Sequence, residues 1–231
     1  MIRYYFVLFF ILLLVYIFLF SPIFRIQALE MSGNKEINTE HIKNNFDYKN
    51  IFLYTKDKIE KDLIQKFPKI SNIEISKNLI KRTLKLNIEE RERLGIVCKE
   101  EKCFYIDKQG FIFEDAPQTS GFLILLIKDF SQREYSLGDQ IFEEKIINSI
   151  YEIRESIFPE TGIRVLEFNI ASLPAIELKA MTNEGWYILF DLTRDIKTQL
   201  LSLKAALQEK IKDRKGLEYV DLRIENRIYY K

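Results

Sequence analysis

The first part of the chain is a single apolar run. The segment YYFVLFFILLLVYIFLFSPIF, residues 4–24, holds no ionisable side chain other than tyrosine. As a helix that rises about 1.5 Å per residue it spans roughly 30 Å, the thickness of the hydrocarbon core of a bilayer. A cleaved signal peptide has a shorter apolar core and small residues at its cleavage site, whereas bulky residues follow Ser21 here. We therefore expect an uncleaved membrane anchor. Basic residues flank it on both sides, so the positive-inside rule does not fix its orientation.

Residues 25–92 carry the patterns of three strands and two helices. The segment FRIQALEMSGNKEI predicts a strand that runs into a turn. Asn38 or Thr39 can cap a short helix, and Thr55 can cap a second helix that Pro68 closes. Two alternating strands follow, ISNIEI and TLKLNIEE. The predicted order is strand, helix, helix, strand, strand.

Strands dominate from Leu94 onward. GIVC and CFYID predict a hairpin, and DKQG, residues 107–110, predicts a tight turn in which Gly110 takes the positive φ that such turns need. The segment FLILLIKD, residues 122–129, is a continuous apolar run, which is typical of a centrally buried strand.

Two helices and a three-strand meander complete the pattern. One helix carries an apolar stripe from Phe142 to Ile157 and is expected to end at Pro159 and Gly162. VLEFNI, AIELKA and WYILFD predict the meander, and a last helix runs from Asp195 to about residue 212. The predicted fold class is α+β: an N-terminal transmembrane helix, a small βααββ unit, and a mostly antiparallel β-sheet domain with two covering helices.

The chain finishes on the segment YVDLRIENRIYYK, residues 219–231. Apolar and polar residues alternate through it, with a polar break at residues 225–226, so it predicts two short closing strands. An unpaired strand edge exposes free N–H and C=O groups and is a liability unless another chain pairs with it. The C-terminal strand is therefore a candidate docking site.

The charge balance and the two cysteines bear on which partners and sites the protein can have. The 35 basic and 34 acidic residues nearly cancel, which argues against a nucleic-acid partner. Cys98 and Cys103 face each other across the predicted hairpin; a cross-strand disulfide and two reduced, partly buried thiols are both compatible with this pattern. Two thiols without a nearby histidine fall short of a tetrahedral metal site.

No catalytic constellation is visible. The one histidine, His41, sits in a short polar segment, and Glu89, Glu90 and Glu92 alternate with arginines in a way that is typical of a solvated strand edge. No phosphate loop, GxSxG, HExxH or SxxK motif is present. We therefore predict no enzyme activity, no catalytic or metal-binding residues and no cofactor. An extracytoplasmic cell-wall hydrolase is the rival reading, because acids from distant segments leave no local signature.

Several segments resemble one bacterial family. The segment FRIQALEMSGNKEINTEHIKNN, directly after a single anchor, resembles the start of a POTRA domain, and FPKISNIEISKNLIKRTLKLNIEERERLGIV matches its later part. CFYIDKQGFIFED resembles the D-x-x-G hairpin that opens the β domain of the FtsQ/DivIB cell-division family, and LEYVDLRIENRIYYK is similar to that family's closing strands. The chain departs from many members in its three-residue tip, its cysteine pair and its end at Lys231. The resemblance implies a cytoplasmic tip (1–3), an anchor (4–24), a POTRA domain (25–92) and a β domain (93–231).

The resemblance also implies a function. It predicts a single-pass protein of the bacterial plasma membrane and division septum, with its N-terminus cytoplasmic and its bulk extracytoplasmic. The β domain would bind coiled-coil partners of the FtsB/DivIC and FtsL types and link early division proteins to septal peptidoglycan synthesis. A POTRA-type transport or assembly scaffold is a further alternative. We expect a partner to bind by adding a strand to the edge of the sheet at the last strand, that is, by β-augmentation. The expected contact residues are Arg223, Ile224, Asn226, Arg227, Ile228 and Tyr230. Ile224 and Ile228 can equally be core residues.

Overall fold

The structure is a computed structural model that describes residues 2–46, 49–225 and 227–231. The chain folds into two compact units, Met1–Arg91 and Glu92–Lys231.

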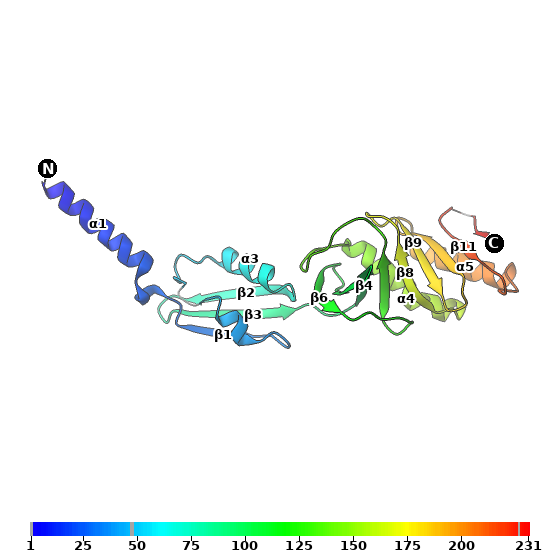
Figure 1. Ribbon diagram of the computed structural model, residues 1–231, viewed down its shortest axis with the longest axis horizontal. Helices are drawn as coiled ribbons and strands as arrows, with labels where there is room; N and C mark the ends of the chain where they lie inside the picture. Colours follow the sequence, from blue (N-terminus) through cyan, green and yellow to red (C-terminus); the bar gives the residue numbers. More distant parts are fainter. Residues whose placement is uncertain (1, 47–48, 226) are drawn as a thin grey trace. The chain divides into compact units, whose positions relative to one another are not determined.

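The first element, α1 (Ile2–Phe20), is the predicted apolar helix (Figure 1). Its window from Arg3 to Phe20 has a mean hydropathy of 2.3 and is not buried by the rest of the protein, so its length and composition suffice to cross a membrane. The helix ends before the apolar run does, because Pro22 lacks the N–H that would continue the hydrogen-bond ladder. Pro22–Phe24 form a short 3₁₀ turn, η1, capped by the Ser21 hydroxyl.

The rest of the first unit is a three-stranded sheet with two helices, in the predicted order strand, helix, helix, strand, strand (Figure 1). The sheet order is β1-β3-β2, with β1 parallel and β2 antiparallel to β3. The elements are β1 (Ala28–Ser32), α2 (Thr39–Lys43), α3 (Lys56–Lys66), β2 (Ile70–Asn78) and β3 (Thr83–Glu90).

Both helices of this unit start at residues that the sequence marks as caps. The Asn38 side chain accepts the Glu40 N–H at 2.8 Å, and the Thr55 hydroxyl accepts the Lys58 N–H at 3.4 Å. The apolar faces of the helices pack on the sheet in one core, whose buried residues are Ile42, Phe46, Tyr54, Ile59, Leu63, Ile70, Ile73, Leu84, Leu86 and Ile88.

The second unit is built on a nine-stranded sheet of order β12-β11-β10-β9-β8-β7-β4-β5-β6. Five of its eight pairings are antiparallel and three are parallel, so the sheet is mostly antiparallel, as predicted. The strands are β4 (Gly95–Lys99), β5 (Lys102–Ile106), β6 (Ile112–Ala116), β7 (Leu125–Asp129), β8 (Val165–Ile170), β9 (Glu177–Thr182), β10 (Tyr187–Asp191), β11 (Tyr219–Asp221) and β12 (Tyr229–Tyr230).

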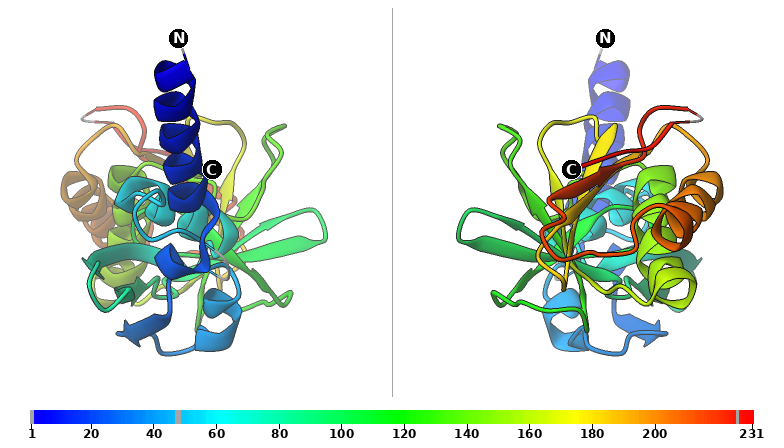
Figure 2. Two further views of the ribbon diagram at one scale, coloured as in Figure 1. Left: turned by 90° about the vertical axis from the view of Figure 1, so that its left-hand side faces the viewer. Right: turned by 90° about the vertical axis from the view of Figure 1, so that its right-hand side faces the viewer.

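Two helices, α4 (Glu144–Thr161) and α5 (Ile196–Glu209), lie side by side against one face of this sheet (Figure 2, right). Each provides a crossover between parallel neighbours, α4 from β7 to β8 and α5 from β10 to β11. Their apolar stripes pack on the inward-facing strand residues in one large core. Trp186 is fully buried there.

The two cysteines form a disulfide across the β4–β5 hairpin. Cys98 pairs with Cys103 in the strand register, and their Cα atoms lie 4.1 Å apart. With Ile96 and Leu126 they make a small buried cluster. Of the two alternatives that the sequence left open, the structure contains the bridged form.

The apolar run at residues 122–129 is only partly a strand, and the expectation that all of it is buried is wrong. Strand β7 begins at Leu125, which pairs with Gly95, the first residue of β4, so the three residues before it have no strand to pair with. Phe122, Leu123 and Ile124 are exposed. Arg154 of α4 holds their loop by donating to the Phe122 and Leu123 carbonyls, the latter at 2.8 Å.

The expected end of α4 is confirmed at Gly162 and wrong at Pro159. The helix continues past Pro159 to Thr161 and ends at Gly162, which is left-handed at φ 74° and donates its N–H to the Phe158 carbonyl. Proline loses one backbone hydrogen bond, and a left-handed glycine is a common residue just past a helix end. Gly162 therefore ends the helix, and Pro159 lies within its last turn.

Candidate partner-binding edge

Strand β11 is fixed by the burial of alternate residues. Val220 and Leu222 are buried in the main core, and β11 pairs in parallel with β10 from Tyr219 to Asp221. The Leu222 N–H continues the ladder by donating to the Leu189 carbonyl at 3.0 Å. The main chain of β11 is thus satisfied on the side of β10, and its other side faces β12.

Strand β12 closes this side and forms the edge of the sheet. It pairs antiparallel with β11, with Val220 opposite Tyr230. Tyr219 and Lys231 exchange two N–H···O bonds of 3.3 Å. In an antiparallel ladder such pairs alternate with pairs whose main-chain groups point away from each other. The N–H and C=O of Tyr230 therefore point to the outer side of β12, where the part of the chain that the structure describes supplies no further strand.

The reversal between β11 and β12 is braced by Arg223. Its Nε and Nη2 atoms donate to the two carboxylate oxygens of Asp221 at 2.9 and 2.7 Å, and its Nη1 lies 2.7 Å from Oε1 of Glu177 on β9. Hydrogen bonds from Arg223 lower the pKa of the Asp221 carboxyl group, against the opposing effect of burial. The arginine thus ties the turn to its own sheet.

A second arginine holds the same turn from the other side. Arg194, in the loop before α5, donates from Nη1 to the carbonyls of Leu222 and Arg223 at 3.2 and 2.9 Å. Arg194 was not among the residues predicted for this site. No pattern in the sequence marked it, because its partners are main-chain atoms almost thirty positions later.

A groove of about 490 Å³ runs beside the edge, between α5 and the terminal segment. Small side chains of α5, including Ser202, Ala205 and Ala206, form one wall. The other wall comes from the C-terminal segment, in particular Ile228 and Tyr230. Ile228 and Tyr230 are two positions apart, as expected of side chains that share one face of a strand.

Four of the six predicted contact residues line this groove, and they differ in exposure. Ile224 and Tyr230 are each 49% exposed and Arg227 is exposed, whereas Ile228 is half-buried and packs on the main core. The core alternative therefore describes Ile228 better than Ile224. Arg223 lies outside the groove lining and binds two carboxylates of its own domain. Asn226 lies outside the described residues.

The opposite face of the edge carries stacked aromatic side chains. The rings of Tyr187 and Tyr219 stack with centroids 5.7 Å apart, and Lys179 places its Nζ 3.8 Å from the Tyr187 ring centroid. These contacts join β9, β10 and β11 on the face away from the helices. They stabilise the three strands that lie next to β12.

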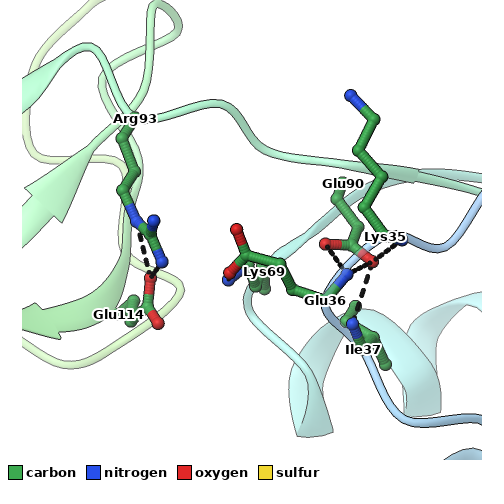
Figure 3. A network of polar contacts seen from close by, with 7 residues as sticks. All are labelled: Lys35, Glu36, Ile37, Lys69, Glu90, Arg93 and Glu114. Atoms are coloured by element: carbon green, nitrogen blue, oxygen red, sulfur yellow. Dashed lines mark hydrogen bonds and ion pairs between the residues drawn. The ribbon is translucent and has the colours of Figure 1, made fainter.

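The acidic cluster before the β domain has a structural role. The Glu90 carboxylate accepts the backbone N–H groups of Lys35, Glu36 and Ile37 and so holds the segment after β1 (Figure 3). In the second unit Arg93 pairs with Glu114 through two hydrogen bonds of 3.0 and 2.7 Å (Figure 3). Glu90 is thus a ligand for main-chain groups, which the solvated-edge interpretation did not foresee.

Nothing in the described residues assembles a metal site: no group of three or more His, Cys, Asp or Glu side chains lies close enough together to hold an ion. His41 lies on α2 and is exposed.

Known proteins that resemble this chain include cell division proteins. Residues 24–91 match the family model of the POTRA domain, FtsQ-type. The cell division protein DivIB of Clostridium acetobutylicum is 24% identical over 214 residues, which cover 90% of this chain and 83% of the relative. DivIB of Clostridium botulinum (strain Loch Maree) is 28% identical, with coverage of 96% and 88%. The solved major extracytoplasmic domain of DivIB from Geobacillus stearothermophilus, at 14% identity, covers 53% of this chain and 98% of that domain, with a TM-score of only 0.32.

These comparisons agree with the architecture. The FtsQ-type POTRA match falls on the βααββ unit, and the two DivIB relatives extend over most of both units and are named as division proteins, which supports a role in cell division. Residues 24–91 thus match an FtsQ-type POTRA domain, and over most of its length the chain is similar to DivIB cell division proteins.

Proposed function

We propose that this chain is a bitopic scaffold of the division machinery, with α1 in the plasma membrane, its N-terminus in the cytoplasm and its two folded units outside. It catalyses nothing itself. At the septum it binds partners of the FtsB/DivIC and FtsL types and so links early division proteins to septal peptidoglycan synthesis. The observation that carries this proposal is the position of β12 at the edge of the sheet, with the main-chain groups of Tyr230 directed outward.

A partner strand can add to this edge by β-augmentation. The outward N–H and C=O of Tyr230 supply main-chain hydrogen bonds, which give affinity for an extended segment of any sequence. Alternate side chains of the partner reach the groove beside α5, where apolar surface from Ile224, Ile228 and Tyr230 is available. Aromatic and arginine side chains are the usual anchors of interfaces, so Tyr230 and the exposed Arg227 are the main candidates for side-chain contacts.

The rival reading, a membrane-anchored cell-wall hydrolase, finds less support. A cavity of about 640 Å³ lies between the start of α4 and residues 173–176, and its lining contains one carboxylate, Glu143. Glycoside hydrolysis commonly uses two carboxylates that flank the scissile bond. Among the described residues that line this cavity there is therefore no acid pair of the kind that such chemistry commonly uses.

The proposal is tested at the main chain of Tyr230. Tyr230→Pro removes the outward N–H and leaves the bonds between Lys231 and Tyr219 in place, since proline is tolerated on a strand edge. Tyr230→Ala is the matched control, because it removes the phenol and keeps the N–H. We expect the proline variant to bind an FtsB/DivIC-type partner roughly two- to tenfold more weakly than the alanine variant, the loss of one net hydrogen bond.

Binding is measured by titration of the purified partner, with circular dichroism to show that each variant is folded. A chain that ends after residue 226 lacks β12 altogether and is expected to lose the partner while it remains folded. Normal affinity of that truncated chain would overturn the edge-strand mechanism. Digestion of peptidoglycan by the wild-type protein would favour the hydrolase instead.

A further inference from the structure

The turn between β2 and β3 exposes two apolar side chains. Ile80 is 95% exposed, more than any other large apolar residue among those that the structure describes, and its neighbour Leu79 is 44% exposed. Arg82, at the end of the turn, has a positive φ of 52°, which is uncommon for a residue other than glycine. Exposed apolar side chains at the tip of a turn contribute little to the stability of the fold. Leu79 and Ile80 are therefore available to contact an apolar surface outside the unit.

The register of the sheet puts this turn at the end of the unit where α1 arrives. β1 and β3 run parallel, with Ala28 opposite Thr83, so both strands start at the same end (Figure 1). The Arg82 carbonyl accepts the Gln27 N–H at 2.9 Å, and the Arg82 guanidinium donates to the Ile23 carbonyl at 2.8 Å. The turn is therefore bound directly to the segment that follows α1.

The last turn of α1 is itself packed against this end. The Phe18 ring lies 5.2 Å from that of Phe24 and 5.8 Å from that of Phe52, and Asn50 donates its side-chain N–H to the Phe18 carbonyl at 2.7 Å. When α1 crosses a bilayer, these contacts hold the end of the folded unit at the bilayer surface.

The charges in the segments that meet at this end are basic, and Asp57 follows them in the first turn of α3. Three segments meet there: residues 21–28, 49–56 and 77–83. The first two are joined by main-chain hydrogen bonds from Ile51 to Phe24 and from Ile26 to Lys49. None of the three segments contains an aspartate or glutamate. Their basic residues are Arg25, Lys49, Lys56, Lys77, Lys81 and Arg82. Basic residues beside an apolar pair fit an anionic lipid surface, where the apolar side chains enter the interface and the cations meet the headgroups.

We infer that the β2–β3 turn is a second membrane contact: Leu79 and Ile80 enter the interface of the bilayer that α1 spans, and the exposed lysines nearby, Lys49, Lys56 and Lys81, bind anionic phospholipid headgroups. This inference rests on the proposed membrane crossing of α1. It makes the POTRA domain a membrane-apposed module held at two points, by α1 and by the turn.

The test is the depth of single probes in the full-length protein. Both native cysteines are in the disulfide, so an introduced cysteine is the only free thiol for a polarity-sensitive fluorophore. The probe is placed at Ile80→Cys and, as matched control, at Gln65→Cys, which is exposed in the last turn of α3 near the other end of the unit. The protein is reconstituted in vesicles of phosphatidylcholine with or without phosphatidylglycerol, and lipids with nitroxides at the headgroup quench interfacial probes.

We expect a blue-shifted, quenched emission at residue 80 and neither effect at residue 65. The effect at residue 80 weakens without phosphatidylglycerol and after Lys81→Glu, but not after Lys61→Glu, the same charge change on α3. A probe at Leu12→Cys reports α1 itself through nitroxides deep in the acyl chains. If that probe is quenched and residue 80 stays in water, the turn contact is wrong and the anchor stands. If neither is quenched, the anchor proposal falls as well.

Discussion

The guanidinium group of Arg223 forms ion pairs with two carboxylates, those of Asp221 and Glu177. The pair with Asp221 is expected to make the stability of the protein depend on pH. Because Arg223 lowers the pKa of Asp221 in the folded protein, the pair contributes stability above the ordinary carboxyl pKa of 3.8 and loses it as the pH falls toward the lowered value. Asp221→Asn is therefore expected to reduce the free energy of unfolding by about 1–3 kcal/mol at pH 7. The deficit shrinks below pH 3.8. Urea denaturation of both proteins across this range measures it.

Glu177→Gln is the control, because that carboxylate is 63% exposed and exposed ion pairs contribute little. We expect a smaller loss at pH 7 from this change than from Asp221→Asn. A deficit of Asp221→Asn that is the same at pH 7 and in acid would show that the ionised pair is not its cause.

Single residues were predictable where the signal is local. Asn38 and Thr55 cap their helices as the sequence indicates, because a cap bonds to N–H groups two or three positions away. Arg223 was expected to contact a partner protein. In the structure it forms ion pairs with Asp221 and with Glu177 on β9, and the sequence pattern did not predict these pairs. Long-range polar contacts depend on the register of the sheet, which a single sequence leaves open.

Among the elements, the turn at residues 107–110 depends on glycine for two reasons. Gly110 has φ 86°, and a Cβ at this position would lie 2.0 Å from the Phe142 carbonyl oxygen. Gly185 shares the positive φ, at 91°, but has open space around it. Gly185→Ala is thus expected to cost about 1–2 kcal/mol for the left-handed backbone alone, and Gly110→Ala distinctly more. Chemical denaturation of the two variants and the wild type compares them; equal losses would mean that the contact with Phe142 relaxes freely.

The limits of strands and helices were harder to predict than their order. The run at residues 122–129 is apolar throughout, but only Leu125–Asp129 finds neighbours in β4 and β8. The closing segment alternates on both sides of its polar break, but only Tyr219–Asp221 and Tyr229–Tyr230 form strands. In both cases the length of a strand is set by the partner beside it, which hydrophobic periodicity does not reveal. Edge position, by contrast, was predicted for the last strand and is observed.

At the scale of the whole molecule, the order of the parts could be predicted, because each has its own period and its own core. The buried cluster of the first unit contains residues 42–88, and those of the second contain residues 96–222. No buried residue of these clusters is shared between the units. Each unit therefore has a core of its own, and the two units should behave as separate folding domains.

The strongest consequence is that the β domain alone should carry partner binding. Residues 92–231 contain the complete nine-stranded sheet, both covering helices and the disulfide, and 140 residues is a typical size for an independent domain. We expect this fragment to unfold in one cooperative transition and to bind an FtsB/DivIC-type partner with the affinity of residues 25–231, whereas residues 25–91 alone do not bind. Calorimetry and partner titration measure both. A fragment that folds but binds the partner much more weakly would place part of the partner site on the POTRA domain, and the C-terminal edge would then be only one of two contact surfaces.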